Sequence, residues 1–170
     1  MKVVVSGGIG TGKSTAVRAA MKRLGWREPA GFFTHWGGTE RGGPELFLET
    51  WSGDIQPVAR RSAHAAPGAL PYELDLPAFE RAARAGLLPA ESGRPAVIDE
   101  LGLIEGGAAE FREALARLFR GAAPVLAVVQ ERALDVWRPF IESGEPVHWL
   151  TLDAGNRDAL PGHIAGLFRD

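Results

Sequence analysis

The chain contains 170 residues, with 19 lysine and arginine residues against 21 aspartate and glutamate residues and a formal net charge of −2 at pH 7. This length fits one domain, residues 1–170, and the balanced charge provides no general basic field for nucleic acid. Cysteine is absent, which excludes disulfides and thiolate metal sites, and neither a signal peptide nor an apolar run of about 18 residues is present. We therefore expect a soluble, cytoplasmic protein that binds neither nucleic acid nor membranes.

The first predicted element is a strand at residues 2–6, and a glycine-rich loop follows it directly. Residues 7–14 read GGIGTGKS and fill the pattern G-x-x-x-x-G-K-[ST], which between a strand and a helix is typical of a phosphate-binding P-loop. Glycines let backbone N–H groups approach phosphate oxygens, where a side chain would obstruct them. Lys13 can reach the β- and γ-phosphates, and the Ser14 hydroxyl is a hard oxygen suited to Mg²⁺. The alternative is a glycine-rich turn with a solvated lysine.

The next segment predicts a helix and then a hairpin. Apolar residues recur at helical spacing over residues 14–24, and Gly25 supplies a stop. An aromatic strand at 32–36, a glycine-rich turn at 37–44 and a second strand at 46–51 predict antiparallel pairing.

A short apolar strand that ends in two acids is the second informative segment. Residues 52–72 are expected to form a loop rich in Pro, Ala and Arg, and Asp75 is expected to cap the helix that comes next. The acidic strand follows this helix. Residues 95–98 are apolar and lead into Asp99 and Glu100. If this strand lies beside the P-loop strand, Asp99 can hold Mg²⁺ in the Walker B role, and Glu100 can activate the attacking water. Alternatively, the two carboxylates form a turn or cap a helix.

The remaining residues continue the alternation of helices and strands. In chain order they predict a helix around 111–119, a strand at 125–129, a short helix near 132–140, a strand at 147–151 and a final helix over 160–168. This order predicts an α/β protein with the P-loop NTPase fold: a mainly parallel sheet with helices on both faces and an inserted antiparallel hairpin.

Further polar residues are candidates for contacts to the nucleotide. A triphosphatase benefits from a second cation on the γ-phosphate, and Arg41, Arg60 and Arg157 are candidates because each lies in a predicted loop or at an element end. The alternative for each is a solvated surface arginine. Asn156 and Arg157 follow the last strand, where they can contact the base or ribose, or Asn156 can start the terminal helix.

Five segments in this order resemble one known family. They are Gly31-Phe32-Phe33-Thr34, Ser52-Gly53, the segment from Tyr72 to Glu80, Val97-Ile98-Asp99-Glu100-Leu101-Gly102 with Glu105, and Asn156-Arg157-Asp158 with Leu160-Pro161. Together with the P-loop they resemble the small THEP-type nucleoside triphosphatases. The chain departs from that family in the hairpin, where residues 35–43 read HWGGTERGG and Arg41 is the one positive charge.

The resemblance implies Mg²⁺-dependent hydrolysis of ATP, GTP and other nucleoside triphosphates with weak base selectivity. Two other functions stay open: a small-molecule or nucleotide kinase that uses the same P-loop, and a nucleotide-dependent regulatory switch. A guanine-specific switch would carry an Asn-Lys-x-Asp motif, which the chain lacks. No segment identifies a protein partner.

The predicted site residues fall into three groups. The catalytic candidates are Lys13, Glu100 and Arg60. The metal-binding candidates, for Mg²⁺, are Ser14 and Asp99. The nucleotide-binding candidates are Gly7, Gly8, Ile9, Gly10, Thr11, Gly12, Lys13, Ser14, Thr15, Asn156 and Arg157.

Overall fold

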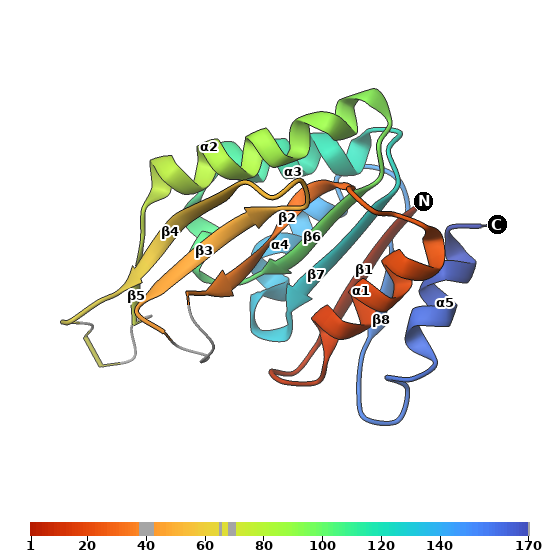
Figure 1. Ribbon diagram of the computed structural model, residues 1–170, viewed down its shortest axis with the longest axis horizontal. Coiled ribbons are helices and arrows are strands. Elements are labelled where there is room, and N and C mark those ends of the chain that lie inside the picture. Colours follow the sequence, from red (N-terminus) through yellow and green to blue (C-terminus); the bar gives the residue numbers. More distant parts are fainter. Residues whose placement is uncertain (38–42, 65, 68–70, 170) are drawn as a thin grey trace.

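The computed structural model describes residues 1–37, 43–64, 66–67 and 71–169 (Figure 1). The strands are β1 (Lys2–Gly7), β2 (Ala30–Trp36), β3 (Glu45–Thr50), β4 (Ile55–Arg61), β5 (Tyr72–Leu74), β6 (Ala96–Leu101), β7 (Val125–Gln130) and β8 (His148–Thr151). The helices are α1 (Lys13–Leu24), α2 (Leu76–Leu87), α3 (Ala109–Arg120), α4 (Leu134–Ile141) and α5 (Leu160–Leu167), with short 3₁₀ helices η1 (Leu88–Ser92), η2 (Ile104–Gly107) and η3 (Glu131–Ala133).

The described strands form one mixed sheet in the order β5-β4-β3-β2-β6-β7-β1-β8. The strands β2, β6, β7, β1 and β8 are parallel to one another in the sheet, whereas β3, β4 and β5 add an antiparallel extension beside β2. The predicted α/β class, the mainly parallel sheet and the inserted antiparallel strands are confirmed.

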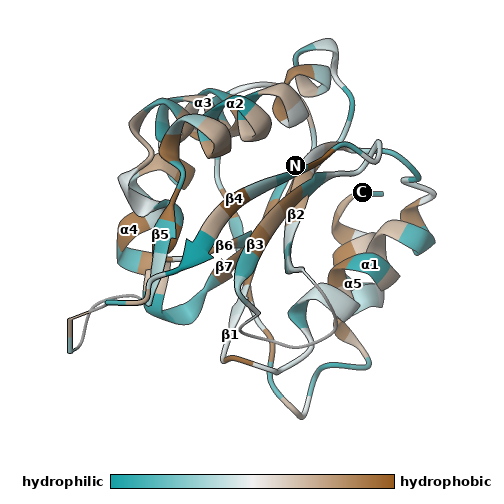
Figure 2. Cartoon of the chain, turned by 60° about the vertical axis from the view of Figure 1, so that its left-hand side comes forward, coloured by the Kyte–Doolittle hydropathy of each residue, from teal (hydrophilic) through white to brown (hydrophobic). Residues whose placement is uncertain are grey.

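Helices cover the sheet in two layers. α2, α3 and α4 lie on one face, and α1 and α5 lie side by side on the other (Figures 1 and 2). The central strand β1 is buried on both faces: Val4 packs in the cluster under α2–α4, and Val3 and Val5 pack in the cluster under α1 and α5. Burial on both faces explains why this strand is a continuous apolar run instead of an alternating one. Among the described residues no helix combines the length and apolar character needed to cross a bilayer.

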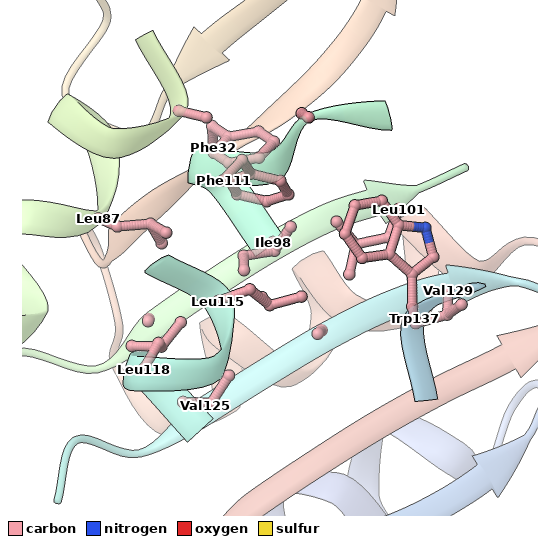
Figure 3. Close-up of a cluster of buried hydrophobic side chains, with 14 of the residues drawn as sticks. Phe32, Leu87, Ile98, Leu101, Phe111, Leu115, Leu118, Val125, Val129 and Trp137 are labelled. Atoms are coloured by element: carbon pink, nitrogen blue, oxygen red, sulfur yellow. The ribbon is translucent and has the colours of Figure 1, made fainter. Parts of the chain in front are cut away.

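The larger core cluster combines aliphatic side chains with a group of aromatic rings, among them Phe32, Phe111 and Trp137 (Figure 3). Phe111 of α3 lies with its ring centroid 5.7 Å from Phe32 of β2 and 5.7 Å from Trp137 of α4. Trp137 is fully buried, and its indole N–H donates to the carbonyl of Gly102, 2.8 Å away. This packing anchors the backbone that follows β6, where the predicted acidic residues lie.

The prediction of a loop over residues 52–72 is wrong in part, because β4 and β5 lie within or at the end of this segment. Two features of the sequence explain why β4 was not predicted. Pro57 cannot donate to a ladder and normally argues against a strand, but it lies outside the part of β4 that pairs with β5. Opposite Leu46 and Phe47 the register shifts, so that Val58 is an extra residue and the period of two is interrupted.

The expected neighbour of the P-loop strand is also corrected. β6 does not lie beside β1, because β7 pairs with both of them and separates them. The residue at the carboxyl end of β7 is Gln130, which is in register with Gly7 of the P-loop. The strand between the P-loop strand and the acidic strand therefore ends in a polar residue.

Candidate active site

The P-loop connects β1 to α1 with a backbone that requires glycine at defined positions. Gly10 and Gly12 have φ values of 78° and 95°, in the left-handed region. At Gly7 a β-carbon would lie 2.6 Å from the carbonyl oxygen of Leu152, in the segment after β8. Gly12 occupies the N-cap position of α1 and brings no side chain to it, so the first backbone N–H groups of α1 are free to bind an anion.

Lys13 spans the loop from the first turn of α1. Its side chain is 6% exposed, and Nζ donates to the carbonyl oxygens of Gly7 at 3.0 Å and Gly8 at 2.8 Å. A carboxylate oxygen of Glu100 lies 3.5 Å from the same Nζ. The ammonium therefore sits between the loop and the end of β6.

Ser14 and Asp99 meet across the sheet edge. Ser14 Oγ donates to Asp99 Oδ1 at 3.0 Å. Burial, with a smaller contribution from the neighbouring Glu100, raises the pKa of Asp99 to about 6, although the Ser14 hydrogen bond and the Arg18 and Lys13 charges act in the opposite direction. A buried carboxylate with few cationic partners is an environment that a bound cation would improve.

These two oxygens fit Mg²⁺. The ion takes one or two protein oxygens and completes an octahedron with waters and substrate phosphates, so a dedicated cage of side chains is not expected. The described residues contain no cluster of three or more His, Cys, Asp or Glu side chains that could hold a metal ion. Ser14 and Asp99 are the residues that would hold the metal next to the P-loop.

Glu100 reaches the same site as Asp99 although adjacent strand residues normally face opposite sides of a sheet. From Ile98 to Leu101, β6 advances three residues while β7 advances two, from Ala127 to Val129. The extra residue is a bulge, and bulges re-aim side chains. Glu100 Oε1 accepts a hydrogen bond from Gln130 Nε2 at 2.6 Å, and Oε2 faces Lys13.

The family model described as NTPase matches residues 2–165. The chain belongs to this NTPase family. Membership confirms the THEP-type resemblance and supports hydrolysis of nucleoside triphosphates as the general activity. No curated protein is significantly similar to the chain in sequence.

Two solved structures share the fold of this NTPase. The crystal structure of THEP1 from the hyperthermophile Aquifex aeolicus is 24% identical with a TM-score of 0.78, and the match covers 100% of both chains. The solution structure of a human cancer-related nucleoside triphosphatase is 24% identical with a TM-score of 0.79, and the match covers 99% of this chain and 97% of that one. At this identity the two structures establish the fold.

Two described candidates, Arg60 and Arg157, do not line the pocket that contains the acidic pair. Arg60 lies on β4 in the antiparallel extension, is 78% exposed and pairs loosely with Glu73 at 4.0 Å. Arg41 lies outside the described residues. Arg157 is exposed in the segment between β8 and α5. The structure therefore does not assign the second cation to any of these arginines.

Asn156 is used within its own loop. Its Oδ1 accepts from the backbone N–H of Asp153 at 3.0 Å, and its Nδ2 donates to the carbonyl of Thr151 at 2.8 Å. Its backbone carbonyl accepts from Leu160 N at 2.9 Å, at the start of α5. The Asn156 side chain therefore bonds within the segment after β8 and does not cap α5, whose N-cap is Ala159. A contact of Asn156 with the base or ribose stays a prediction.

The site contains residues that sequence reasoning missed. The pocket around Lys13, Ser14, Asp99 and Glu100 has a volume of about 780 Å³. Its lining also includes Thr34, Trp36, Tyr72, Leu103, Gln130 and Arg132. Gln130 ends the apolar strand β7, and Asp99 and Glu100 lie near the end of β6, so a polar residue close to a strand end was the available signal.

Proposed function

We propose that the chain catalyses Mg²⁺-dependent hydrolysis of nucleoside triphosphates, ATP and GTP among them, to nucleoside diphosphate and phosphate. The observation that carries this proposal is the convergence of Lys13 and Ser14 from α1 with Asp99 and Glu100 from β6, linked by contacts of 3.0 and 3.5 Å. A triphosphate chain needs both a cationic cradle and a metal, and a hydrolase in addition needs a carboxylate near the terminal phosphate.

The P-loop and Lys13 are proposed to bind the phosphates. The backbone N–H groups of the P-loop would bind phosphate oxygens, and Lys13 would exchange its bonds to loop carbonyls for phosphate oxygens. Ser14 and Asp99 would hold Mg²⁺, which would offset negative charge on the β- and γ-phosphates. Binding therefore orients the γ-phosphate toward the end of β6.

Glu100 is the proposed general base. A water molecule attacks the γ-phosphorus in line, its oxygen forms the new P–O bond, and its proton passes to a carboxylate oxygen of Glu100. The bond from the γ-phosphorus to the bridging oxygen breaks, and the diphosphate leaves with both electrons of that bond. The products are a nucleoside diphosphate and inorganic phosphate.

Weak base selectivity and a cytoplasmic location belong to the same proposal. Asn156 engages its own loop, and the chain has no Asn-Lys-x-Asp motif for guanine. A chain without cysteine suits a reducing compartment.

The test is phosphate release from ATP, GTP, CTP and UTP, with Mg²⁺ and with EDTA, for the parent and for Glu100→Gln. We expect the parent to hydrolyse several triphosphates with Mg²⁺ only, and Glu100→Gln to bind nucleotide but to lose roughly 10²–10⁴-fold in kcat. Glu113→Gln, an exposed change on α3, is the matched control. A parent that binds nucleotide but releases no phosphate would overturn the proposal.

A second candidate is phosphoryl transfer to an acceptor other than water. The pocket continues from the P-loop beyond Glu100 to Trp36 and Tyr72, whose rings lie 4.4 Å apart, and to Leu103. This apolar end lies away from β8 and is suited to a ring-bearing molecule. Incubation with [γ-³²P]ATP and a panel of nucleosides would yield labelled products only if transfer occurs, and label confined to inorganic phosphate excludes it for that panel.

A further inference from the structure

A chain of hydrogen bonds runs along the carboxyl end of β7 to the acidic pair. Arg132 Nε donates to Gln130 Oε1 at 3.1 Å, and Gln130 Nε2 donates to Glu100 Oε1 at 2.6 Å. Arg132 is exposed, Gln130 is partly buried, and both line the pocket that contains Lys13. The amide of Gln130 is thus a bridge between an exposed cation and the proposed base.

The orientation of the Gln130 amide is determined by its two hydrogen-bond partners, Arg132 and Glu100. A guanidinium group can only donate hydrogen bonds, and an ionised carboxylate can only accept them. The amide of Gln130 satisfies both neighbours in one orientation, with its oxygen toward Arg132 and its nitrogen toward Glu100. Loss of Arg132 would remove one of the two hydrogen bonds that hold the amide, and the bond from Gln130 Nε2 to Glu100 would then be less firmly positioned.

The backbone of Gly102 forms a seat for the same amide. A β-carbon at Gly102 would lie 3.1 Å from Cδ, Nε2 and Oε1 of Gln130. Gly102 is held from both sides, since Trp137 Nε1 donates to its carbonyl at 2.8 Å and its N–H donates to Glu105 Oε2 at 3.0 Å. The amide therefore packs closely against the Gly102 backbone, and a side chain at residue 102 would require the amide to shift.

We propose that Gln130 is a positioning residue that holds the Glu100 carboxylate for water activation, and that Arg132 acts in series with it by orienting the Gln130 amide. The proposal rests on the proposed function, because it takes Glu100 as the base. It predicts an effect on turnover and not on nucleotide affinity, since neither side chain is needed to cradle the phosphates. A misplaced base slows the chemical step steeply even when the substrate is bound normally.

The kinetic test compares kcat and KM for Mg²⁺-ATP among the parent, Gln130→Met, Arg132→Ala and the double variant. Methionine keeps the length of glutamine and removes the donor. We expect Gln130→Met to lower kcat by roughly 10–100-fold with KM changed less than about threefold. Arg132→Ala should lower kcat by a smaller factor, and should have no further effect in the Gln130→Met background. Arg132→Lys, which retains a donor, should recover part of the loss.

Two kinetic results would overturn the proposal. If Arg132→Ala costs the same factor with and without Gln130, Arg132 contacts the substrate directly and does not act through the amide. If Gln130→Met leaves kcat unchanged, or alters KM alone, Gln130 does not position the base.

A steric test leaves the polar groups in place. Gly102→Ala should push the Gln130 amide and lower kcat in the same direction as Gln130→Met. Gly107→Ala is the matched control, because a β-carbon there meets nothing within 4 Å. Circular dichroism and thermal unfolding of both variants show whether the fold is retained. A folded Gly102→Ala protein with parental kcat would contradict the claim that packing against Gly102 positions the Gln130 amide.

A measurement that does not depend on turnover tests the hydrogen bonds of Gln130 separately from the proposed function. The chain contains two glutamines, Gln56 and Gln130, and one asparagine, Asn156, so few side-chain amide signals appear in a ¹⁵N NMR spectrum. We expect the Gln130 amide protons to exchange with solvent more slowly than those of Gln56, and Arg132→Ala to remove that protection without affecting Gln56. Equal exchange of both amides in the parent refutes the proposal that Arg132 and Glu100 hold the Gln130 amide. Protection in a protein that releases no phosphate would instead refute the hydrolase proposal alone.

Discussion

Ser14 on α1 and Asp99 on β6 are separated by 85 residues in the chain and joined by a 3.0 Å hydrogen bond. Both lie at the carboxyl edge of the parallel strands, Ser14 one residue into the helix after β1 and Asp99 near the end of β6. The strand β7 that separates β1 from β6 does not prevent this contact, because α1 contacts both β7 and β6 on its face of the sheet. The contact joins the phosphate cradle to the acidic pair.

The first prediction concerns Asp99→Asn. An amide is a weaker Mg²⁺ ligand than a carboxylate, so we expect the Mg²⁺ concentration for half-maximal nucleotide binding to rise by roughly 10–100-fold. A Mg²⁺ titration with a fluorescent nucleotide analogue measures this change. Asp135→Asn, an exposed carboxylate on α4, serves as the control. An Asp99→Asn protein with an unchanged Mg²⁺ requirement would contradict the metal role of Asp99.

The second prediction concerns the pH dependence of stability through Glu105. Burial raises the pKa of this carboxyl from 4.5 to about 7, against its hydrogen bonds from backbone N–H groups. The unfolded chain therefore releases its proton near pH 4.5 while the folded chain keeps it until about pH 7. In that window the folded state binds more protons, so stability falls as pH rises, by on the order of 3 kcal/mol over the whole window.

Glu105→Gln removes this dependence and keeps an oxygen for the N–H of Gly102. Relative to the parent, its free energy of unfolding should increase from pH 4.5 to pH 7 and then level off. Urea unfolding at several pH values measures the difference, and Glu113→Gln controls for the lost charge. A difference that does not change with pH would show that folding does not raise the pKa of Glu105.

The third prediction concerns the buried amino group of Lys2. Nζ donates to the carbonyl oxygens of Leu118 at 3.1 Å, Gly121 at 2.7 Å and Ala123 at 2.6 Å, at the end of α3 and just beyond it. Burial lowers the pKa of Lys2, which Glu145 partly offsets. Lys2→Met leaves these acceptors without a donor and should destabilise the protein by about 2–3 kcal/mol.

Lys22→Met is the comparison for Lys2, because Lys22 is exposed in the last turn of α1. Thermal and urea unfolding of the two variants should show a clear loss of stability for Lys2→Met only. Equal stability of both would mean that water replaces the ammonium without cost.

The fourth prediction distinguishes Asn156 from a nucleotide ligand. Asn156→Ala removes two hydrogen bonds within the loop after β8 and should lower stability by about 1 kcal/mol. The KM for ATP and GTP should change less than about threefold, since the loop and not the base is affected. Asp158→Asn, on an exposed neighbour, controls for position. Unchanged stability with a tenfold higher KM would instead make Asn156 a base or ribose contact.

Local residue types were sufficient for the binding elements. Residues 7–14 predicted the P-loop because its chemistry depends on neighbouring backbone groups and one lysine, which lie together in any fold that permits the turn. Asp75 likewise predicted a helix start, and its side chain accepts from Ala78 N at 3.0 Å. The acidic strand end at Asp99 and Glu100 was also evident from its apolar run.

Sheet order could not be predicted in the same way. The sequence by itself determined that an α/β fold with a P-loop and an acidic strand end would form, because helix and strand periods and turn residues are local. Only the tertiary structure placed β7 between β1 and β6, made Gln130 and Arg132 neighbours of Glu100, and carried Arg60 into the outer extension. Strand neighbours are selected by burial and backbone pairing across the whole chain, and hydrophobic periodicity does not encode that choice.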